Sequence, residues 1–321
     1  MHVYTSDRFV LPLPAGHRFP MAKYRLLHDR VAAGLPALGA SLLDAPRADD
    51  TAVLRVHTAD YLAKVRDGTL SAAEQRRIGF PWSPEMAERT RRVSGAMMAA
   101  LESAIRGCGV GVNLAGGTHH SRADHGAGYC IFNDSVIAAR HVQALGLARR
   151  VLVIDLDVHQ GNGTASICQG DPSIYTFSIH CARNYPAVKP QGDLDVALPA
   201  GTGDDEYLAA LERNLAYAHS QARPEAAIYL AGADPFSGDA LGFLELSKGG
   251  LRQRDRMVFD HCRRHALPVA ISMAGGYAPQ VTDIVDIHYA TIEAAAALAR
   301  DDGWYPPRKP AQVYACTGVD D

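Results

Sequence analysis

Five short apolar runs alternate along the chain with longer segments of helical pattern, and this alternation is the strongest constraint on the fold. The runs are rich in β-branched residues and apolar on both faces, as expected for parallel strands covered by helices on either side. Strands that alternate with helices predict a three-layer α/β fold with a central, mostly parallel sheet flanked by helices. The runs cover residues 110–114, 151–156, 174–179, 227–230 and 269–273.

The segments between these runs predict helices. The first begins at Ser83-Pro84-Glu85, where Ser can cap the helix, Pro suits its first turn and Glu favours the positive end of its dipole. It continues to about residue 105. The first 70 residues show no clear pattern, and we expect residues 303–321 to form a surface tail. Further helices are expected at 134–145, 204–222, 248–265 and 281–300.

The composition is that of an ordinary globular protein. With 321 residues, 47% of them hydrophobic, the chain can form one large core, so we expect a single domain over residues 1–321. The net charge of −3 argues against direct binding to nucleic acid or to an anionic membrane. The apolar runs are too short for membrane spans. We expect a cytoplasmic protein, because the N-terminus does not have the pattern of a signal peptide and the six cysteines are scattered. The sequence defines no oligomeric state.

Polar residues follow the predicted strands. Residues 115–120 read AGGTHH, 155–163 read DLDVHQGNG, 231–234 read AGAD and 274–277 read AGGY, and His180 follows the third run. In an open α/β sheet, ligands bind outside the carboxyl ends of the strands. We therefore expect one site that collects these His, Asp, Gly and Tyr residues.

Asp155, Asp157 and His159 lie two residues apart, so their side chains share one face at a strand end. Polar groups on a buried strand are costly unless they are satisfied, and a cation is the natural partner. Asp234, after a different strand, adds a further ligand. Two Asp and one His with room for water are typical of a catalytic metal site. The alternative is a buried Asp–His pair without metal, which Asp234 and the paired histidines nearby make less favoured.

The adjacent histidines His119 and His120 follow two glycines that permit a tight turn under a pocket. Histidines with different neighbours can carry different charges. One can accept a proton from water and pass it to a leaving amine, while the other, paired with Asp155, stays largely cationic. We do not place Asp155 among the metal ligands. It orients a histidine or holds a second, monovalent cation.

Other residues have both a functional and a structural interpretation. Tyr277 can donate a hydrogen bond to a carbonyl oxygen that gains charge, or it packs in a loop. Asn162 is a partner of His120 or a turn residue. Gly128 and Tyr129 line a pocket or are structural, and composition alone favours the structural role. The remaining histidines have no partner pattern, and we expect surface or satisfied core positions for His28, His57, His125, His141, His219, His261, His265 and His288.

Together these motifs resemble the zinc-dependent histone deacetylase family. The matching stretches are GGTHHSRADHGAGYCIFND (116–134), RVLVIDLDVHQGNGT (150–164), AGADPFSGDALGFLELS (231–247) and MAGGY (273–277), with VHTADYLAKV (56–65) as an earlier segment. The likeness runs from about residue 15 to residue 295. It is strongest toward the class IV branch and its bacterial relatives, because of DLDVHQGNG, GTGDDEYLAALERN (201–214) and GHRFPMAKY (16–24).

The resemblance implies an arginase/deacetylase-type fold and Zn²⁺ on Asp157, His159 and Asp234. Fe²⁺ stays possible, since a carboxylate-rich site accepts either ion. A structural K⁺ is also implied, with ligands, several of them backbone carbonyls, from Asp155, Asp157, His159, Ser178 and Ile179.

The resemblance also implies roles in catalysis. His120 would be the general base and acid, with His119 electrostatic and paired to Asp155, and Tyr277 would polarise the acyl carbonyl. Residues that would line an acyl-lysine channel are Gly128, Tyr129 and Tyr185.

Two positions depart from the class I pattern. Asn162 stands where class I members carry Asp, so His120 would be a weaker base. Lys23 stands where they carry an Arg below the metal, so acetate release or acyl-chain preference would differ.

The sequence thus predicts a metal-dependent hydrolase of N-acylated amines. The expected substrate is an acylated lysine in a peptide or protein, with an acylated polyamine or another small amide as the alternative. A binuclear manganese ureohydrolase needs more carboxylates, and Asn162 and the lack of a second Asp close before Asp234 argue against it. A non-catalytic binder of acylated amines is disfavoured by the intact set of His, Asp and Tyr residues.

Overall fold

A computed structural model describes residues 1–301 and 303–306 of the chain. Its centre is an eight-stranded sheet in the order β2-β1-β3-β8-β7-β4-β5-β6. Every neighbouring pair is parallel, so the predicted α/β fold is confirmed. The strands are β1 (His2–Thr5), β2 (Ser41–Asp44), β3 (Val110–Asn113), β4 (Val151–Asp155), β5 (Ile174–Cys181), β6 (Leu194–Leu198), β7 (Ala226–Leu230) and β8 (Val269–Ser272).

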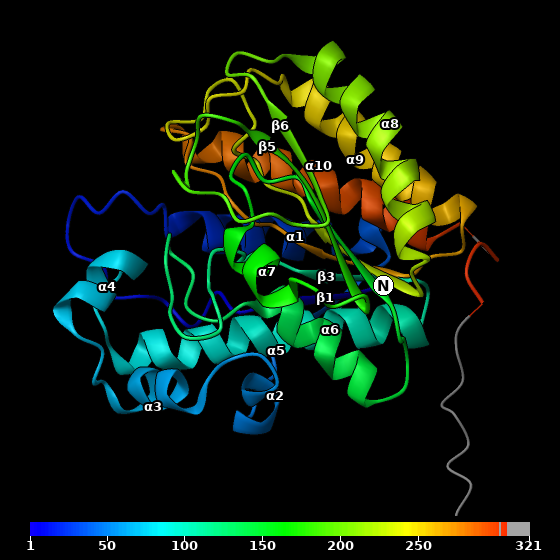
Figure 1. The fold of residues 1–321 in the computed structure, drawn as a ribbon. Helices are drawn as coiled ribbons and strands as arrows, with labels where there is room; N and C mark the ends of the chain where they lie inside the picture. Colours follow the sequence, from blue (N-terminus) through cyan, green and yellow to red (C-terminus); the bar gives the residue numbers. More distant parts are fainter. Residues whose placement is uncertain (302, 307–321) are drawn as a thin grey trace, which may run out of the picture.

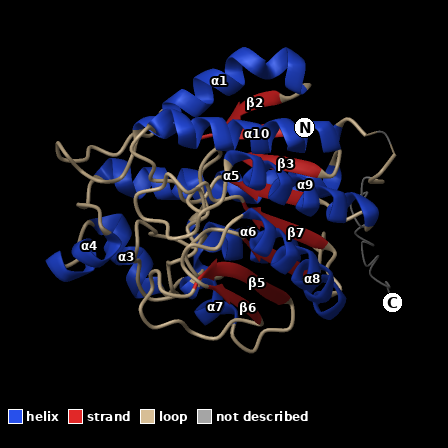
Figure 2. Cartoon of the chain, turned by 90° about the horizontal axis from the view of Figure 1, so that it is seen from above, coloured by secondary structure: helices blue, strands red, loops and turns tan. Residues whose placement is uncertain are grey.

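Helices cover both faces of this sheet (Figures 1 and 2). The five predicted strands and five predicted helices are present, with ends that differ by at most two residues. The sequence analysis missed the short strands β1, β2 and β6 and five helices. The helices are α1 (Ala22–Leu38), α2 (Asp50–Leu54), α3 (Ala59–Asp67), α4 (Ala72–Ile78), α5 (Pro84–Arg106), α6 (Asp134–Ala144), α7 (Asn162–Cys168), α8 (Asp204–Ala222), α9 (Lys248–Arg264) and α10 (Val281–Ala299).

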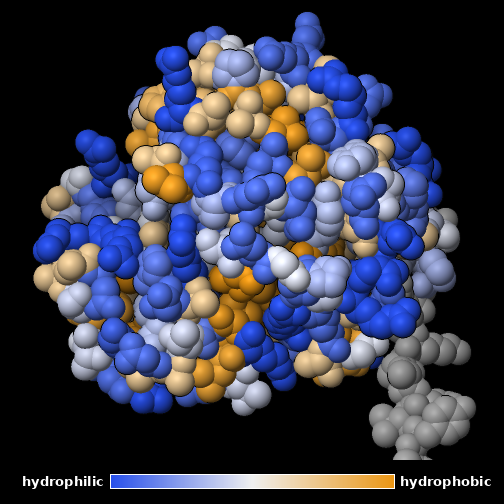
Figure 3. Space-filling model, in the orientation of Figure 1, coloured by the Kyte–Doolittle hydropathy of each residue, from blue (hydrophilic) through white to orange (hydrophobic). Residues whose placement is uncertain are grey.

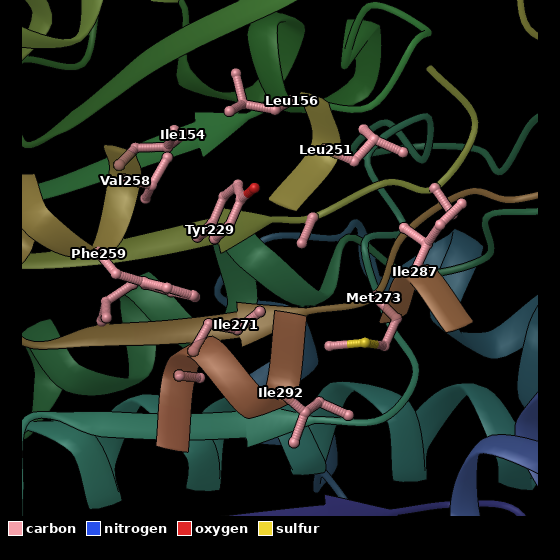
Figure 4. Packing of buried hydrophobic residues seen from close by; sticks show 14 of the residues in the cluster. Ile154, Leu156, Tyr229, Leu251, Val258, Phe259, Ile271, Met273, Ile287 and Ile292 are labelled. Atoms are coloured by element: carbon pink, nitrogen blue, oxygen red, sulfur yellow. The ribbon is translucent and has the colours of Figure 1, made fainter. Parts of the chain in front are cut away.

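Alternating side chains of the strands supply two separate cores. In β7, Ala227 and Tyr229 pack into the core beneath α1, α8, α9 and α10, whereas Ile228 and Leu230 pack into the core beneath α5 and α6. This is the two-residue period of a strand that is buried on both faces. Figure 4 shows the first of these cores, where Tyr229 lies close to Ile154 and Ile271.

Side-chain caps fix the beginnings of the helices that frame the site. Ser83 accepts a hydrogen bond from the backbone N–H of Met86 at the start of α5, as the sequence predicted. Asn133 does the same for α6, with Val136 as donor. Each cap satisfies a backbone donor that the helix leaves free, and so specifies where the preceding loop ends.

The described end of the chain differs from the predicted surface tail. Tyr305 is buried, and its hydroxyl donates a hydrogen bond to the carbonyl of Ile105 at 2.8 Å. An aromatic side chain with a hydrogen-bond partner gains more by packing than by facing water. Residues 307–321 of that predicted tail lie outside the described residues.

The face shown in Figure 3 is mostly hydrophilic, with apolar patches between the charged side chains. Within the described residues, no helix combines the length and the apolar character that crossing a bilayer requires.

Candidate active site

The residues with predicted chemistry gather in the loops that follow β3, β4, β7 and β8. These four strands are neighbours in the order β3-β8-β7-β4, and parallel strands end at the same edge of a sheet. In Figure 2 the loops crowd together at the end of the sheet away from the N-terminus. The topology therefore brings the histidines after β3, the Asp-rich segment after β4, Asp234 after β7 and Tyr277 after β8 to one place.

Asp157, His159 and Asp234 form a compact buried group. Their potential ligand atoms all lie within 4.8 Å of one another. His159 Nδ1 lies 2.9 Å from Asp157 Oδ1 and 3.3 Å from Asp234 Oδ2. Gly275 is part of the enclosure: its backbone N–H donates to Asp157 Oδ2 at 2.8 Å, and a Cβ there would lie 1.9 Å from Asp234 Oδ2. Only a glycine fits against these carboxylates.

The chemistry of this group fits a divalent cation. Asp234 Oδ2 is buried, and apart from its 3.3 Å ion-pair contact with His159 Nδ1 it has no hydrogen-bond partner among the described residues, although such atoms are normally paired. Burial and the nearby Asp157 carboxylate raise the pKa of Asp234. The two carboxylates also outweigh burial at His159 and raise its pKa to about 10. The group thus attracts positive charge. A metal ion would take the place of the proton that the two carboxylates favour on His159.

His119 and Asp155 form a buried pair next to this group. His119 Nδ1 lies 2.7 Å from Asp155 Oδ2, and both residues are almost fully buried. Burial favours neutral histidine, but the carboxylates of Asp155 and Asp157 outweigh it and raise the pKa of His119 to about 9. A pKa of about 9 makes His119 cationic at neutral pH.

His120 has a different environment. Its Nδ1 lies 2.7 Å from the amide oxygen of Asn162, which can only accept, so Nδ1 carries the proton and Nε2 keeps its lone pair. Burial, together with the positive charge of His119, holds the pKa of His120 well below its ordinary value. Of the two adjacent histidines, His119 is thus cationic and His120 is neutral, and the neutral imidazole lines the pocket.

Tyr277 lines the same pocket as His120. Burial and the carboxylates of Asp157 and Asp234 hold the pKa of Tyr277 well above its ordinary value, so its hydroxyl stays a hydrogen-bond donor. The sequence analysis missed Asp239, whose Oδ2 accepts from the backbone N–H of Tyr277 at 2.6 Å and so fixes the loop that carries the ring. No spacing in the sequence marks Asp239.

A pocket of about 380 Å³ leads to these groups from the surface. Gly128, Tyr129 and Tyr185 line it, together with His120, His159 and Tyr277. A Cβ on Gly128 would lie 2.7 Å from the ring of His120, so glycine allows this wall to approach the histidine. Tyr185 sets its ring edge-on to His120, with centroids 4.8 Å apart.

The other predicted site residues lie further from the pocket. Lys23 is buried behind Tyr277, where its Nζ donates to the carbonyls of Ala274 (3.4 Å) and Gly276 (3.3 Å), and the described residues that line the pocket do not include it. Ser178 pairs with Asp155 in the β4–β5 register, and its hydroxyl contacts His180 Nδ1 at 3.0 Å. Ile179, the next residue of β5, is fully buried in the core.

Two further residues hold the histidine segment, and the sequence analysis missed both. Asp134 accepts hydrogen bonds from the backbone of Gly117 (3.0 Å) and Thr118 (2.8 Å), directly before the two histidines. Gly163, at the start of α7, approaches so closely that a Cβ would lie 2.2 Å from the carbonyl oxygen of Ser121. Asp134 begins a predicted helix and Gly163 follows Asn162, but neither position reveals a contact across the fold.

The chain is similar to known deacetylases. It matches the histone deacetylase domain over residues 17–292. It is 43% identical to an uncharacterised protein of Picosynechococcus over 294 residues, 91% of this chain and 97% of that protein. A histone deacetylase-like amidohydrolase of Pseudomonas aeruginosa is 32% identical over 79% of this chain and 70% of its own length. Histone deacetylase 2 of Arabidopsis thaliana is 31% identical over 70% of this chain and 60% of its own length.

A solved structure shares the fold. The crystal structure of the HDA15 HD domain matches with a TM-score of 0.78, covers 92% of this chain and 88% of that chain, and is 23% identical in sequence.

Proposed function

The chain belongs to the histone deacetylase family of hydrolases, and from this premise we propose that it removes acyl groups from N-acylated amines with a divalent ion held by Asp157, His159 and Asp234. One observation carries the proposal: the buried Asp–His–Asp group lies at the foot of a pocket whose wall includes a neutral histidine and a protonated tyrosine. A binuclear centre at this position is not supported, because within the described residues this group offers only three mutually close ligands. This argues against the ureohydrolase alternative.

The side chains divide the chemistry between them. An ion bound to the three ligands would act as a Lewis acid toward the acyl carbonyl and the attacking water. His120 takes the proton from that water at Nε2 and delivers it to the leaving amine. The hydroxyl of Tyr277 donates to the carbonyl oxygen as it gains negative charge. His119, cationic beside Asp155, stabilises that charge without moving a proton.

We propose Zn²⁺ as the ion, with Fe²⁺ as the alternative. One imidazole and two carboxylates with room for a water are typical of catalytic zinc sites, and they suit ferrous iron as well. The pairing of His120 with Asn162, together with the class IV-like segments at 16–24 and 201–214, supports placing the chain in that branch. A structural K⁺ near Asp155 and Ser178 stays a proposal.

The rim of the pocket favours an acylated lysine over an acylated polyamine. α4 places the exposed residues Arg76 and Arg77 at the outer end, and no Asp or Glu is among the described residues that line the pocket. An acylated polyamine keeps an ammonium group that two guanidinium groups would repel. Acylation makes a lysine side chain neutral, so the two arginines do not repel it. Acidic residues of the peptide or protein that carries the acyl-lysine would be attracted to Arg76 and Arg77.

Substitution of the proposed catalytic residues tests the reaction. We expect His120→Ala to lower kcat by about 10²–10⁴-fold and Tyr277→Phe by about 10²–10³-fold on acyl-lysine peptides, with metal content unchanged. The matched control is His125→Ala, which removes a histidine outside the pocket. Full activity of either catalytic variant with the metal still bound would contradict the assignment.

A substrate panel tests the class of amine. Acetyl-lysine peptides, longer acyl-lysine peptides and acetylpolyamines are compared by kcat/KM on the zinc-loaded enzyme. Reversing the rim charge with Arg76→Glu and Arg77→Glu together should shift the ratio toward the polyamine by about tenfold. The control pair Arg76→Lys and Arg77→Lys keeps the charge and should keep the ratio. A wild-type preference for polyamines would overturn this substrate class.

A further inference from the structure

A second cluster of potential metal ligands lies at the other end of the sheet. His219 comes from the last turn of α8, and His261 and His265 lie at the end of α9. Both helices finish just before β7 and β8 begin, so the cluster is close to the amino ends of the strands, far from the candidate active site. The two helices pack side by side in Figure 1.

The three imidazoles are in direct contact. His261 Nε2 lies 3.1 Å from His219 Nδ1, and the ring centroids are separated by 4.1 Å (His219–His265), 4.5 Å (His261–His265) and 4.9 Å (His219–His261). One ring nitrogen from each residue can be chosen so that all three lie within 4.8 Å of one another. Within the described residues, none of the three forms an ion pair with a carboxylate, in contrast to His119 and His141.

The spacing suits a transition metal. His261 and His265 are four residues apart, which places them on one face of α9, the arrangement used by helical His pairs that bind zinc. With Zn–N bonds of about 2.0–2.1 Å, two nitrogens of a tetrahedral site are separated by about 3.4 Å. The separation between His219 and His261 is already close to this value. Small rotations of the exposed His265 would bring its nitrogen to the same distance.

A hydrogen bond between two neutral imidazoles explains one of the three contacts only. Within the described residues, the ring of His265 forms no side-chain hydrogen bond, and because it is exposed it adds no apolar burial. Borderline transition metals such as Zn²⁺ and Cu²⁺ prefer imidazole nitrogen, and three histidines with one open position form a complete site for them.

We propose that His219, His261 and His265 form a second metal site, for a divalent transition ion of the Zn²⁺ class, which ties the end of α8 to the end of α9. The exposed edge of His265 leaves the fourth position to water. Because an ion that binds the folded state alone stabilises it, the site acts as a clip between two helices that join different strands of the sheet.

Metal counting tests this proposal. The full-length chain, without an added histidine tag, is equilibrated with Zn²⁺ and dialysed, and bound zinc is measured by mass spectrometry. We expect two ions per wild-type chain and one in His265→Ala, which alters an exposed side chain and so leaves the fold intact. His125→Ala is the matched control and should keep both ions. Equal zinc content in the wild type and in His265→Ala would overturn the proposal whatever the total, because the active-site ligands are the same in both chains.

A spectroscopic titration provides the second readout. Co²⁺ added to the dialysed protein should give a four-coordinate spectrum with two saturable components, and one of these should vanish in His219→Gln and in His265→Ala. Acyl-lysine hydrolysis should be unchanged in both variants, so a negative result here leaves the proposed function untouched. In Asp157→Ala the other component should be lost while the histidine component persists. Loss of the same component in all three variants would show that the cluster binds no ion of its own.

Discussion

Replacing His57 tests how burial of a single histidine sets the acid sensitivity of this fold. His57 is 3% exposed, packs against the rings of Tyr61 and Phe132, and accepts a hydrogen bond at Nε2 from the backbone N–H of Asn133 at 2.9 Å. Burial lowers the pKa of His57 from 6.5 to about 4. The side chain is therefore mostly neutral in the folded protein at pH 5 and above.

The sign of the effect follows from proton linkage. In the unfolded chain His57 binds a proton as the pH falls through about 6.5, whereas in the folded chain it does so only near 4. The unfolded state binds more protons in this window, so the free energy of unfolding falls as the pH drops from 6.5 to 4. With about 1.4 kcal/mol per pKa unit, His57 alone costs the folded state about 2 kcal/mol at pH 5 relative to pH 8.

Two substitutions isolate this contribution. Gln at position 57 can still accept the N–H of Asn133, whereas Phe leaves that donor unpaired and should cost about 1–3 kcal/mol at every pH. Urea unfolding followed by circular dichroism, at pH 8 and pH 5 and with equal metal loading, gives the free energy of unfolding of each protein. Both variants should lose about 2 kcal/mol less than the wild type between the two pH values. If the free energy of unfolding of both variants falls between pH 8 and pH 5 by as much as that of the wild type, the reasoning is refuted.

Three further outcomes are expected. Arg254→Met leaves the buried carboxylate of Asp255 without its cation and should lower the free energy of unfolding by about 3–5 kcal/mol in urea titrations; a change below 1 kcal/mol would count against the pair. Gly163→Ala places a Cβ 2.2 Å from the Ser121 carbonyl and should reduce kcat of acyl-lysine hydrolysis at least tenfold, while Gly203→Ala, with nothing nearer than 3.9 Å, should not. Chelation should lower Tm by scanning fluorimetry, and Zn²⁺ should restore it, because a bound ion stabilises only the folded chain; a Tm indifferent to both would exclude a tightly held ion.

The site residues could be named from the sequence because they follow buried strands of a parallel sheet. Asp157, Asp234 and Tyr277 belong to three different strand ends, and a parallel sheet must bring such ends to one edge. The sequence could not show which strands are neighbours. The order β3-β8-β7-β4 places the loop of Tyr277 between those of His119 and Asp234, and pairing across the sheet decides that order.

The hydrogen-bond partners depend on the tertiary structure even more. Asp239 holds the backbone of Tyr277 from 38 residues away, and Asp134 holds the turn before His119, yet both positions lack any spacing that would reveal the contact. The short edge strands β2 and β6 were missed because their partly exposed side chains lack the continuous apolar pattern of the central strands.

The histidine cluster at the far end of the sheet also depends partly on local sequence and partly on tertiary packing. The predicted helix over 248–265 places His261 and His265 on one face, because four residues complete about one turn, although the sequence analysis identified no partner for either residue. Only the packing of α8 against α9 brings His219 to them, and that contact joins positions 42 residues apart. Local periodicity thus determined the elements and the edge where the site forms, whereas contacts between distant segments, which no local pattern encodes, decided the partners of each side chain.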